Sequence, residues 1–585
     1  MPLLARSLPR VILTLALGLT AFLSPLHAAS PREELLRYVP DDVAFCLVIQ
    51  DLRDHDKALE ESPFMKELAK SPVVQALLQS DDLKNLLKVD EFMRDNLGVD
   101  SVKLRDEIFG DALVFAYRPG PPGKPEAEQG LFLIRARDPK LLAELLDRLN
   151  ELQRKSGDLL ELKELKHHDV AYFRRTERKH EQGKEDRKES NFYLLKGPVL
   201  MFTSQEAILH DAVDHQRDSA AAKESAAAKQ FRLAHADKPL AALWINPRAF
   251  DADMQRKAEE AKGGDAPVLK NLLVYWKAVD SVVLSFDLQK DVTLSASIRA
   301  RVDQLPPAAR RFLSGAAKPS DLWERFPPDA MLATAGRFDL PALVEIVQAF
   351  LPPELNKAMK DAMDRGFGAA LGRDLLTDVL PCVGPDWGLC MVAPPSDDKA
   401  WFPQIVYALR VQPGDKKPPV DQTALDAVNF YAGVAVLAHN SAKDAKPLSL
   451  KSDKQDKVEV KYLTGGDLPA GLEPAFTLNN GYLVLGSSPD AIRRFHAVSP
   501  SKLDSEDVPL LRVSFKEVRR YLKERREPVV AAVAEKHQID KKEASKKIDG
   551  LLTVLQLVDR LELNQHAEAG QVTFTLRVQT ALPLK

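Results

Sequence analysis

One sequence motif occurs twice in this 585-residue chain, and it constrains the fold more than any other feature. The first copy is NFYLLKGPVLMFTSQEAIL, residues 191–209, and the second is AFTLNNGYLVLGSSPDAIRR, residues 475–494. In each copy an apolar strand leads into a turn that contains a glycine, Gly197 or Gly481, and a second apolar strand follows. Glycine supplies the positive φ that a tight hairpin turn requires. The motif therefore predicts a β-hairpin that is followed by a helix, and it predicts this unit twice.

The hydroxyl pairs that end the second strand, Thr203-Ser204 and Ser487-Ser488, have two interpretations. Ser and Thr oxygens can accept hydrogen bonds from the first amides of a helix, and Pro489 suits the first helical position. The alternative is a serine nucleophile in a hydrolase elbow, which requires the pattern Gly-x-Ser-x-Gly. The second glycine of that pattern is missing from both copies, so we expect helix caps.

Other sequence anchors repeat at a slowly drifting spacing. Pro40-Asp41 and Pro328-Asp329 lie 288 positions apart, and each pair precedes an apolar run. The hairpin glycines lie 284 positions apart, and Val279-Asp280 and Val558-Asp559 lie 279 positions apart. Duplication followed by small changes in loop length produces such a drift. The sequence therefore predicts two tandem, similar halves.

These anchors divide the chain into a signal peptide (1–29), a first repeat (30–303), a linker (304–320) and a second repeat (321–585). Strands joined by short turns pair antiparallel, and the predicted helices come in blocks rather than after every strand. We therefore expect an α+β fold in which each half is an antiparallel sheet with helices packed on one face. Each terminal hairpin is expected to close the sheet of its own half.

Within the halves, period-two alternation and helical spacing locate most elements. A helix is expected after Asp138-Pro139, where leucines form one apolar stripe. Strands are expected near 43–49, 112–117, 131–136, 169–174, 240–245 and 330–336, and terminal hairpins over 281–300 and 560–579. Helical patterning also covers 63–96, and loops are expected at 119–130, 174–190, 217–229 and 443–461.

The first residues have the layout of a secretory signal. Arg6 and Arg10 precede an uncharged run over residues 11–23, and small residues follow as far as Ala29. The apolar run is too short for a comfortable membrane span, although an uncleaved anchor is the alternative. We expect an exported chain, periplasmic or extracellular, without a membrane span after cleavage. The formal net charge of −3 gives no reason to expect a nucleic-acid partner.

Three cysteines are too few for a disulfide framework. Cys46 falls within a predicted strand, where burial explains it. Cys382 and Cys390 flank a turn-rich stretch, so they form either a local disulfide or two buried free thiols. The sequence leaves this choice open.

Two histidine groups are candidates for metal or acid–base chemistry. The sequence HDAVDH, His210 to His215, places imidazoles and carboxylates on neighbouring faces of a predicted helix, a ligand set that suits zinc. The second copy reads FHAVSP and keeps only His496. His167-His168-Asp169 stands at a strand entrance beside a charged loop, where a solvated pair is the simpler interpretation. We therefore assign no catalytic, cofactor-binding or metal-binding residue from the sequence.

Other familiar motifs are absent or incomplete. The glycines of residues 366–372 approach a dinucleotide fingerprint, but the spacing is one residue too long and a helix precedes them. Walker A, His-Glu-x-x-His and EF-hand patterns do not occur. Asp444, Asp453 and Asp456 interrupt the lysine-rich segment 443–461, which favours a solvated loop over an anion-binding surface.

The repeated Pro-Asp opening before an apolar strand, together with the glycine, strand, Ser-Ser and helix motif, resembles a family of exported bacterial proteins known only as a domain of unknown function. The resemblance covers most of both halves, and Phe202 stands where the second copy has Gly486. It implies an extracytoplasmic repeat protein and assigns no catalytic residue. No cofactor is expected.

We therefore expect a non-enzymatic envelope-associated or secreted protein that binds an unidentified ligand or envelope protein, using the surface or cleft between its two halves. The alternative is a metal-dependent hydrolase that uses the helix from His210 to His215.

Overall fold

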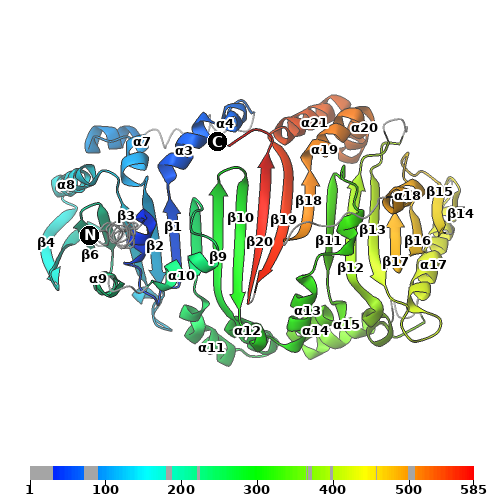
Figure 1. Cartoon of the computed structure of the whole chain (residues 1–585), viewed down its shortest axis with the longest axis horizontal. Coiled ribbons are helices and arrows are strands. Elements are labelled where there is room, and N and C mark those ends of the chain that lie inside the picture. Colours follow the sequence, from blue (N-terminus) through cyan, green and yellow to red (C-terminus); the bar gives the residue numbers. More distant parts are fainter. Residues whose placement is uncertain are drawn as a thin grey trace, which may run out of the picture.

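The computed structural model describes residues 30–71, 90–179, 187–219, 224–363, 365, 372–395, 400–443, 445–455, 458–497, 507–568 and 570–584. The predicted signal peptide (1–29), most of the fingerprint-like run (366–372) and part of the predicted helical stretch (63–96) lie outside these ranges. Within the described residues, twenty strands form one antiparallel sheet that crosses the whole molecule (Figure 1). The fold is a mixed α and β arrangement, as the sequence predicts.

The strands are short and separated by turns or helices. The first ten are β1 (Phe45–Gln50), β2 (Ala112–Arg118), β3 (Gln129–Arg135), β4 (Leu159–His167), β5 (Val170–Lys179), β6 (Arg187–Lys196), β7 (Val199–Thr203), β8 (Ala241–Ile245), β9 (Val279–Leu288) and β10 (Val292–Ala300). The next ten are β11 (Leu332–Arg337), β12 (Val383–Val392), β13 (Gln404–Val411), β14 (Leu448–Gln455), β15 (Val458–Gly465), β16 (Ala475–Asn479), β17 (Tyr482–Gly486), β18 (Val508–Ser514), β19 (Val558–Glu568) and β20 (Gln571–Thr580).

The helices gather above and below the strand ends and over the outer strands (Figure 1). In the first part of the chain they are α2 (Pro31–Leu36), α3 (Leu52–Glu61), α4 (Pro63–Leu68), α7 (Ser101–Lys103), α8 (Pro139–Ser156), α9 (Glu206–Ser219), α10 (Ala226–Leu233), α11 (Asp251–Glu260) and α12 (Asp265–Ala278). They continue as α13 (Pro307–Ala316), α14 (Leu340–Phe350), α15 (Pro353–Met363), α17 (Val420–Asn440), α18 (Pro489–Ala497), α19 (Phe515–Glu524), α20 (Arg526–His537) and α21 (Lys541–Leu555). None of the helices in the described ranges is long and apolar enough to cross a membrane.

The pairing of β1 to β10 starts from β1, which lies between β2 and β8. On one side the order continues through β3, β7, β6, β5 and β4, and on the other through β9 and β10. Strand β11 likewise lies between β12 and β18, with β13, β17, β16, β15 and β14 on one side and β19 and β20 on the other. Each pairing in the first set therefore has a counterpart ten strands later.

The two sets of strands meet at the centre of the sheet. Strand β10 pairs with β20 over eight residues, from Val292 opposite Val578 to Arg299 opposite Gln571. The expectation that each terminal hairpin closes its own sheet is therefore wrong. Without this pairing, the last strand of each hairpin would have one unpaired edge. Pairing of β10 with β20 satisfies the backbone hydrogen-bonding groups of both edges.

Both predicted glycine turns are confirmed. Lys196 pairs with Val199 and Asn479 with Tyr482, so each hairpin turn contains two residues. Gly197 and Gly481 have φ values of 59° and 75°, and Asn480 beside Gly481 also has a positive φ of 51°. In the second turn, positive φ at both central positions is typical of the type I′ turn, which matches the twist of the flanking strands.

The hydroxyl pairs differ between the two copies. The Ser488 hydroxyl accepts a hydrogen bond from the Ala491 amide at 3.1 Å and caps α18, as predicted. The Ser487 hydroxyl instead ties the motif to β13, because it accepts from the Ile405 amide at 2.9 Å. In the first copy the Thr203 hydroxyl accepts from the Gln205 amide at 3.1 Å.

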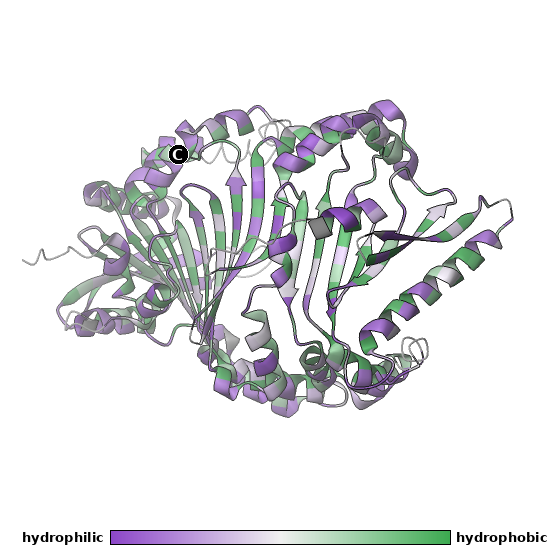
Figure 2. Ribbon diagram, turned by 45° about the vertical axis from the view of Figure 1, so that its right-hand side comes forward, coloured by the Kyte–Doolittle hydropathy of each residue, from purple (hydrophilic) through white to green (hydrophobic). Residues whose placement is uncertain are grey.

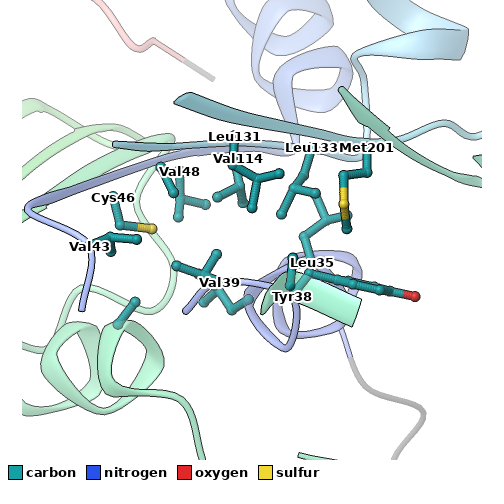
Figure 3. Packing of buried hydrophobic residues seen from close by; sticks show 14 of the residues in the cluster. Leu35, Tyr38, Val39, Val43, Cys46, Val48, Val114, Leu131, Leu133 and Met201 are labelled. Carbon is teal, nitrogen blue, oxygen red and sulfur yellow. The ribbon is translucent and has the colours of Figure 1, made fainter. Parts of the chain in front are cut away.

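Helices cover both faces of β2 and β3, which corrects the expectation of helices on one face. Val114 and Leu133 point toward α2, and Figure 3 shows them facing Leu35. Leu113 and Ile134, their neighbours along the strands, belong to a second core that includes residues of α8. Successive side chains on a strand point to opposite faces, so apolar residues at both parities require a cover on both sides.

Two segments that the sequence assigns to loops form strands instead. Strand β5 extends to Lys179 and β6 begins at Arg187, both within the charged segment 174–190. Strands β14 and β15 occupy most of the lysine-rich segment 443–461. Charged side chains are tolerated in these strands because most of them reach solvent or pair across strands, as Lys179 and Glu189 do at 3.1 Å.

All three cysteines are free thiols, so Cys382 and Cys390 are not joined by a disulfide. Cys46 and Cys390 are buried, and burial raises the pKa of each thiol to about 12. The Cys382 thiol donates to the backbone oxygen of Asp378 at 3.5 Å. The interpretation as free thiols is therefore the correct one.

Candidate functional site

The strands at the centre of the sheet have one apolar face and one polar face. On β10, Leu294, Ala296 and Ile298 alternate with serines, and Figure 2 colours the central strands in alternating bands. Ala296 is opposite Leu284 on β9 and Phe574 on β20. The apolar side chains of neighbouring strands therefore lie in register on the same face, which we call the central apolar face.

The central apolar face is open to solvent. Leu284, Leu294 and Ile298 are 40%, 47% and 36% exposed. A concavity of about 390 Å³ lies on this face and spans the β10–β20 junction. Its lining is Leu47, Ala241, Ala242, Leu243, Leu284, Ser285, Phe286, Leu294, Ser295, Ala296, Leu563, Phe574 and Leu576. The lining contains no charged side chain, so this concavity suits an apolar ligand.

The opposite face of the same strands carries hydroxyl side chains that join β10 to β20. The Ser297 and Thr573 hydroxyls are 2.7 Å apart, and the Ser295 and Thr575 hydroxyls are 3.3 Å apart. The backbone of the central strands is also engaged, because β9, β10 and β20 each pair with a strand on both sides. The central apolar face thus offers a ligand mainly hydrocarbon contacts.

A second site candidate is a cluster of imidazole and carboxylate groups at the β4–β5 turn. The Nε2 atoms of His167 and His168 each lie 3.0 Å from Oδ1 of Asp214 on α9. The three donor atoms all lie within 4.8 Å of one another. We call His167, His168 and Asp214 the histidine cluster.

The helix that carries Asp214 also places His210 against this cluster. The His210 ring stacks on the His167 ring, with centroids 4.0 Å apart and planes 7° apart. The His210 Nε2 lies 3.0 Å from the Tyr172 hydroxyl, which donates to Glu206 Oε1 at 2.6 Å. Burial and then the neighbouring His167 lower the pKa of His210, so its ring is neutral at neutral pH.

The carboxylate of Asp214 responds to competing effects. Its partial burial raises the pKa. The hydrogen bond from His167 and the charges of His167 and His168 lower the pKa, and together they outweigh the effect of burial. The net pKa lies below the ordinary value for aspartate, so Asp214 is ionised at neutral pH. An ionised carboxylate beside imidazoles is a ligand set for a divalent metal ion.

The predicted group from His210 to His215 does not form one site. His210 contacts Tyr172, Asp211 forms an ion pair with Arg118 at 2.7 Å, and His215 lies 3.9 Å from Asp41. Only Asp214 joins the histidine cluster, together with the separate sequence candidates His167 and His168. Asp169 lies within the turn itself. Neighbouring positions on a helix point in different directions, which is why this group separates.

The sequence did not reveal either site candidate as a unit. His167 and Asp214 lie 47 positions apart, and no local pattern links the β4–β5 turn to α9. The signal for the central apolar face was present as alternation in both terminal hairpins. The missing information was that β10 and β20 pair with each other.

Searches of family models, curated proteins and solved structures found no match for this chain.

Proposed function

We propose that this chain is an exported, non-enzymatic binding protein, built from a duplicated α+β domain, whose central apolar face binds the acyl chain of a lipid. The observation that carries the proposal is the open concavity at the β10–β20 junction, which is lined by aliphatic and aromatic side chains. Burying apolar surface contributes roughly 25 cal/mol per Å², so an exposed face of this kind favours a hydrocarbon ligand.

The duplication is supported by two independent patterns. The sequence anchors recur at offsets of 288, 284 and 279 positions. The strand pairings of β1 to β10 recur in β11 to β20, and the central junction lies between the last strands of the two sets. On this proposal the ligand site lies where the two copies meet.

An acyl chain suits the concavity better than a peptide does. A bound peptide strand needs a free sheet edge for its own amide and carbonyl groups, and β9, β10 and β20 have partners on both sides. An extended peptide on this face would leave its buried polar groups without partners, which is costly. A hydrocarbon chain has no polar groups, so its burial against the uncharged lining leaves no hydrogen bond of its own unmade.

Export is supported by the start of the chain, where Arg6 and Arg10 precede an uncharged run and small residues. The resemblance to exported repeat proteins points the same way. A periplasmic or extracellular compartment would bring the protein near membrane lipids. We propose that its partner is therefore an envelope lipid rather than a nucleic acid.

The test is a titration of the full mature chain with a fluorescent fatty acid. The double variant Leu284→Gln with Leu294→Gln removes apolar contacts at two exposed positions and keeps the side-chain size. It should weaken binding by roughly tenfold or more, because each buried leucine contributes about 1.5–3 kcal/mol.

Two further variants make the titration decisive. Leu355→Gln changes a leucine on α15 that is 56% exposed, and binding should stay as in the wild-type protein. Leu437→Gln changes a leucine on α17 that is 70% exposed, which tests a rival apolar surface. The proposal fails if no fatty acid binds, or if Leu437→Gln weakens binding and the double variant does not.

A further inference from the structure

We propose that the histidine cluster is a binding site for a divalent transition-metal ion, preferably zinc. The donor set is two imidazole nitrogens and one carboxylate oxygen, all within 4.8 Å of one another. This combination is usual for zinc, whereas magnesium and calcium prefer oxygen ligands. The inference concerns α9 and the β4–β5 hairpin, and it is independent of lipid binding at the central apolar face.

The spacing of the donor atoms is close to what a tetrahedral ion requires. Zinc–ligand bonds of about 2.0–2.2 Å place neighbouring donors roughly 3.3 Å apart. Each Nε2 lies 3.0 Å from the Asp214 oxygen, a few tenths of an ångström less than this spacing, and the two imidazole donor atoms lie within 4.8 Å of each other. The three side chains are 22%, 49% and 47% exposed, so a water molecule can occupy a fourth position.

The backbone of the turn brings two adjacent imidazoles together. Along an extended strand the side chains of neighbouring residues point to opposite faces. His168 instead has a φ of 48°, a left-handed conformation that is uncommon outside glycine and marks a site worth a functional explanation. The rings of His167 and His168 have centroids 4.4 Å apart as a result.

The surroundings also hold the His167 ring in place. His210 stacks on it face to face, and Tyr172 and Glu206 hold His210 by successive hydrogen bonds. The stacked ring restricts the orientation of the His167 imidazole, as hydrogen bonds from outside the ligand set do at many metal sites. The position of the His167 ring is therefore largely set before an ion binds, which reduces the entropy lost on binding.

A bound ion would tie the outermost hairpin to the rest of the fold. Among the described strands β4 pairs only with β5, so β4 lies at the edge of the sheet. His167 and His168 stand at the β4–β5 turn, and Asp214 lies on α9, which packs against β3, β6 and β7. Metal binding to the folded state alone would stabilise this end of the molecule.

The test uses the full mature chain without a histidine tag, freed of metal with a chelator. Calorimetric titration with zinc and elemental analysis should give one ion per chain, and magnesium should not bind. His168→Ala and Asp214→Asn should each weaken zinc binding by roughly 10- to 100-fold or more, since even residues outside the ligand set cost that much. Zinc should raise the melting temperature of the wild-type chain and should not raise that of the variants.

His537→Ala is the matched control, because His537 is exposed on α20 and lies outside the cluster. Its zinc binding should equal that of the wild-type chain. Failure of the wild-type chain to bind zinc overturns the proposal, as does unchanged zinc binding in both cluster variants. Fatty-acid binding by His168→Ala should remain normal, so this result is separable from the test of the proposed function.

Discussion

Asp386 on β12 is a buried carboxyl group whose environment disfavours its charge. It is 3% exposed, and its Oδ2 accepts a hydrogen bond from the Tyr482 hydroxyl at 3.0 Å. The Arg337 guanidinium lies 4.0 Å from the other oxygen. Burial raises the pKa of Asp386 above its ordinary value, and the opposing effect of Arg337 is smaller.

This shift predicts a pH dependence of stability. Well below about pH 4, the ordinary pKa of an aspartate, the carboxyl is protonated in both the folded and unfolded states. As pH rises from there the unfolded chain ionises first, while the folded state keeps its proton, so the free energy of unfolding falls. Asp386→Asn removes this titration and can still accept from Tyr482.

The measurement is urea unfolding of both proteins across the pH range from about 4 upward. The free energy of unfolding of the wild-type protein, relative to Asp386→Asn, should decrease with rising pH. The free energy of unfolding of the wild-type protein relative to Asp303→Asn, a change at an exposed position, should show no such trend. A relative stability that is constant or that increases with pH would contradict the assignment.

Gly481 tests the motif with which the sequence reasoning began. Its φ of 75° is a conformation that β-branched residues adopt poorly, so Gly481→Val should destabilise the protein by more than about 1 kcal/mol. Gly433→Ala on α17 is a control that should change stability in the opposite direction, toward a more stable protein. Its new Cβ meets nothing within 4 Å, and alanine in a helix interior is favoured over glycine by up to about 1 kcal/mol.

Unfolding midpoints in urea would measure both substitutions. Equal stability of Gly481→Val and the wild-type protein would show that the turn does not require glycine. At this scale the sequence was informative, because glycine and hydroxyl residues act through local backbone geometry. It was not informative for the histidine cluster, because Asp214 meets His167 and His168 only through tertiary packing.

Among the secondary-structure elements, apolar strands were predictable and charged strands were not. Strand β2 was predicted from its apolar run over residues 112–117, and its side chains pack into cores on both faces of the sheet. The segment 174–190 was assigned to a loop because its composition indicates solvation, and a strand near the edge of a sheet can be solvated as well. Pairing with β6 fixes β5, and composition carries no information about that partner.

The start of α18 offers a prediction at the scale of one element. Ser488 is 7% exposed, and its hydroxyl accepts the Ala491 amide. Ser488→Ala should reduce the free energy of unfolding by about 1 kcal/mol, and Ser488→Thr should retain most of it. If alanine and threonine are both neutral in thermal unfolding, the cap contributes nothing to stability.

For the whole molecule, the tandem organisation was inferred from sequence, but the union of the strands into one sheet was not. Offsets between anchors report the order of the elements along the chain. They do not report which strand edges pair across 276 positions, as β10 and β20 do at Ser297 and Thr573. The open concavity depends on that pairing, so the candidate ligand site could be located only in the folded structure.

The most direct test of the proposed function is photochemical labelling by a fatty acid that carries a diazirine on its hydrocarbon chain. After irradiation and proteolysis, mass spectrometry locates the labelled peptides. Our account predicts labels on β9, β10 and β20, and loss of most labelling in the double variant Leu284→Gln with Leu294→Gln. Labels confined to α17, or labels scattered over the surface and unaffected by the double variant, would contradict it.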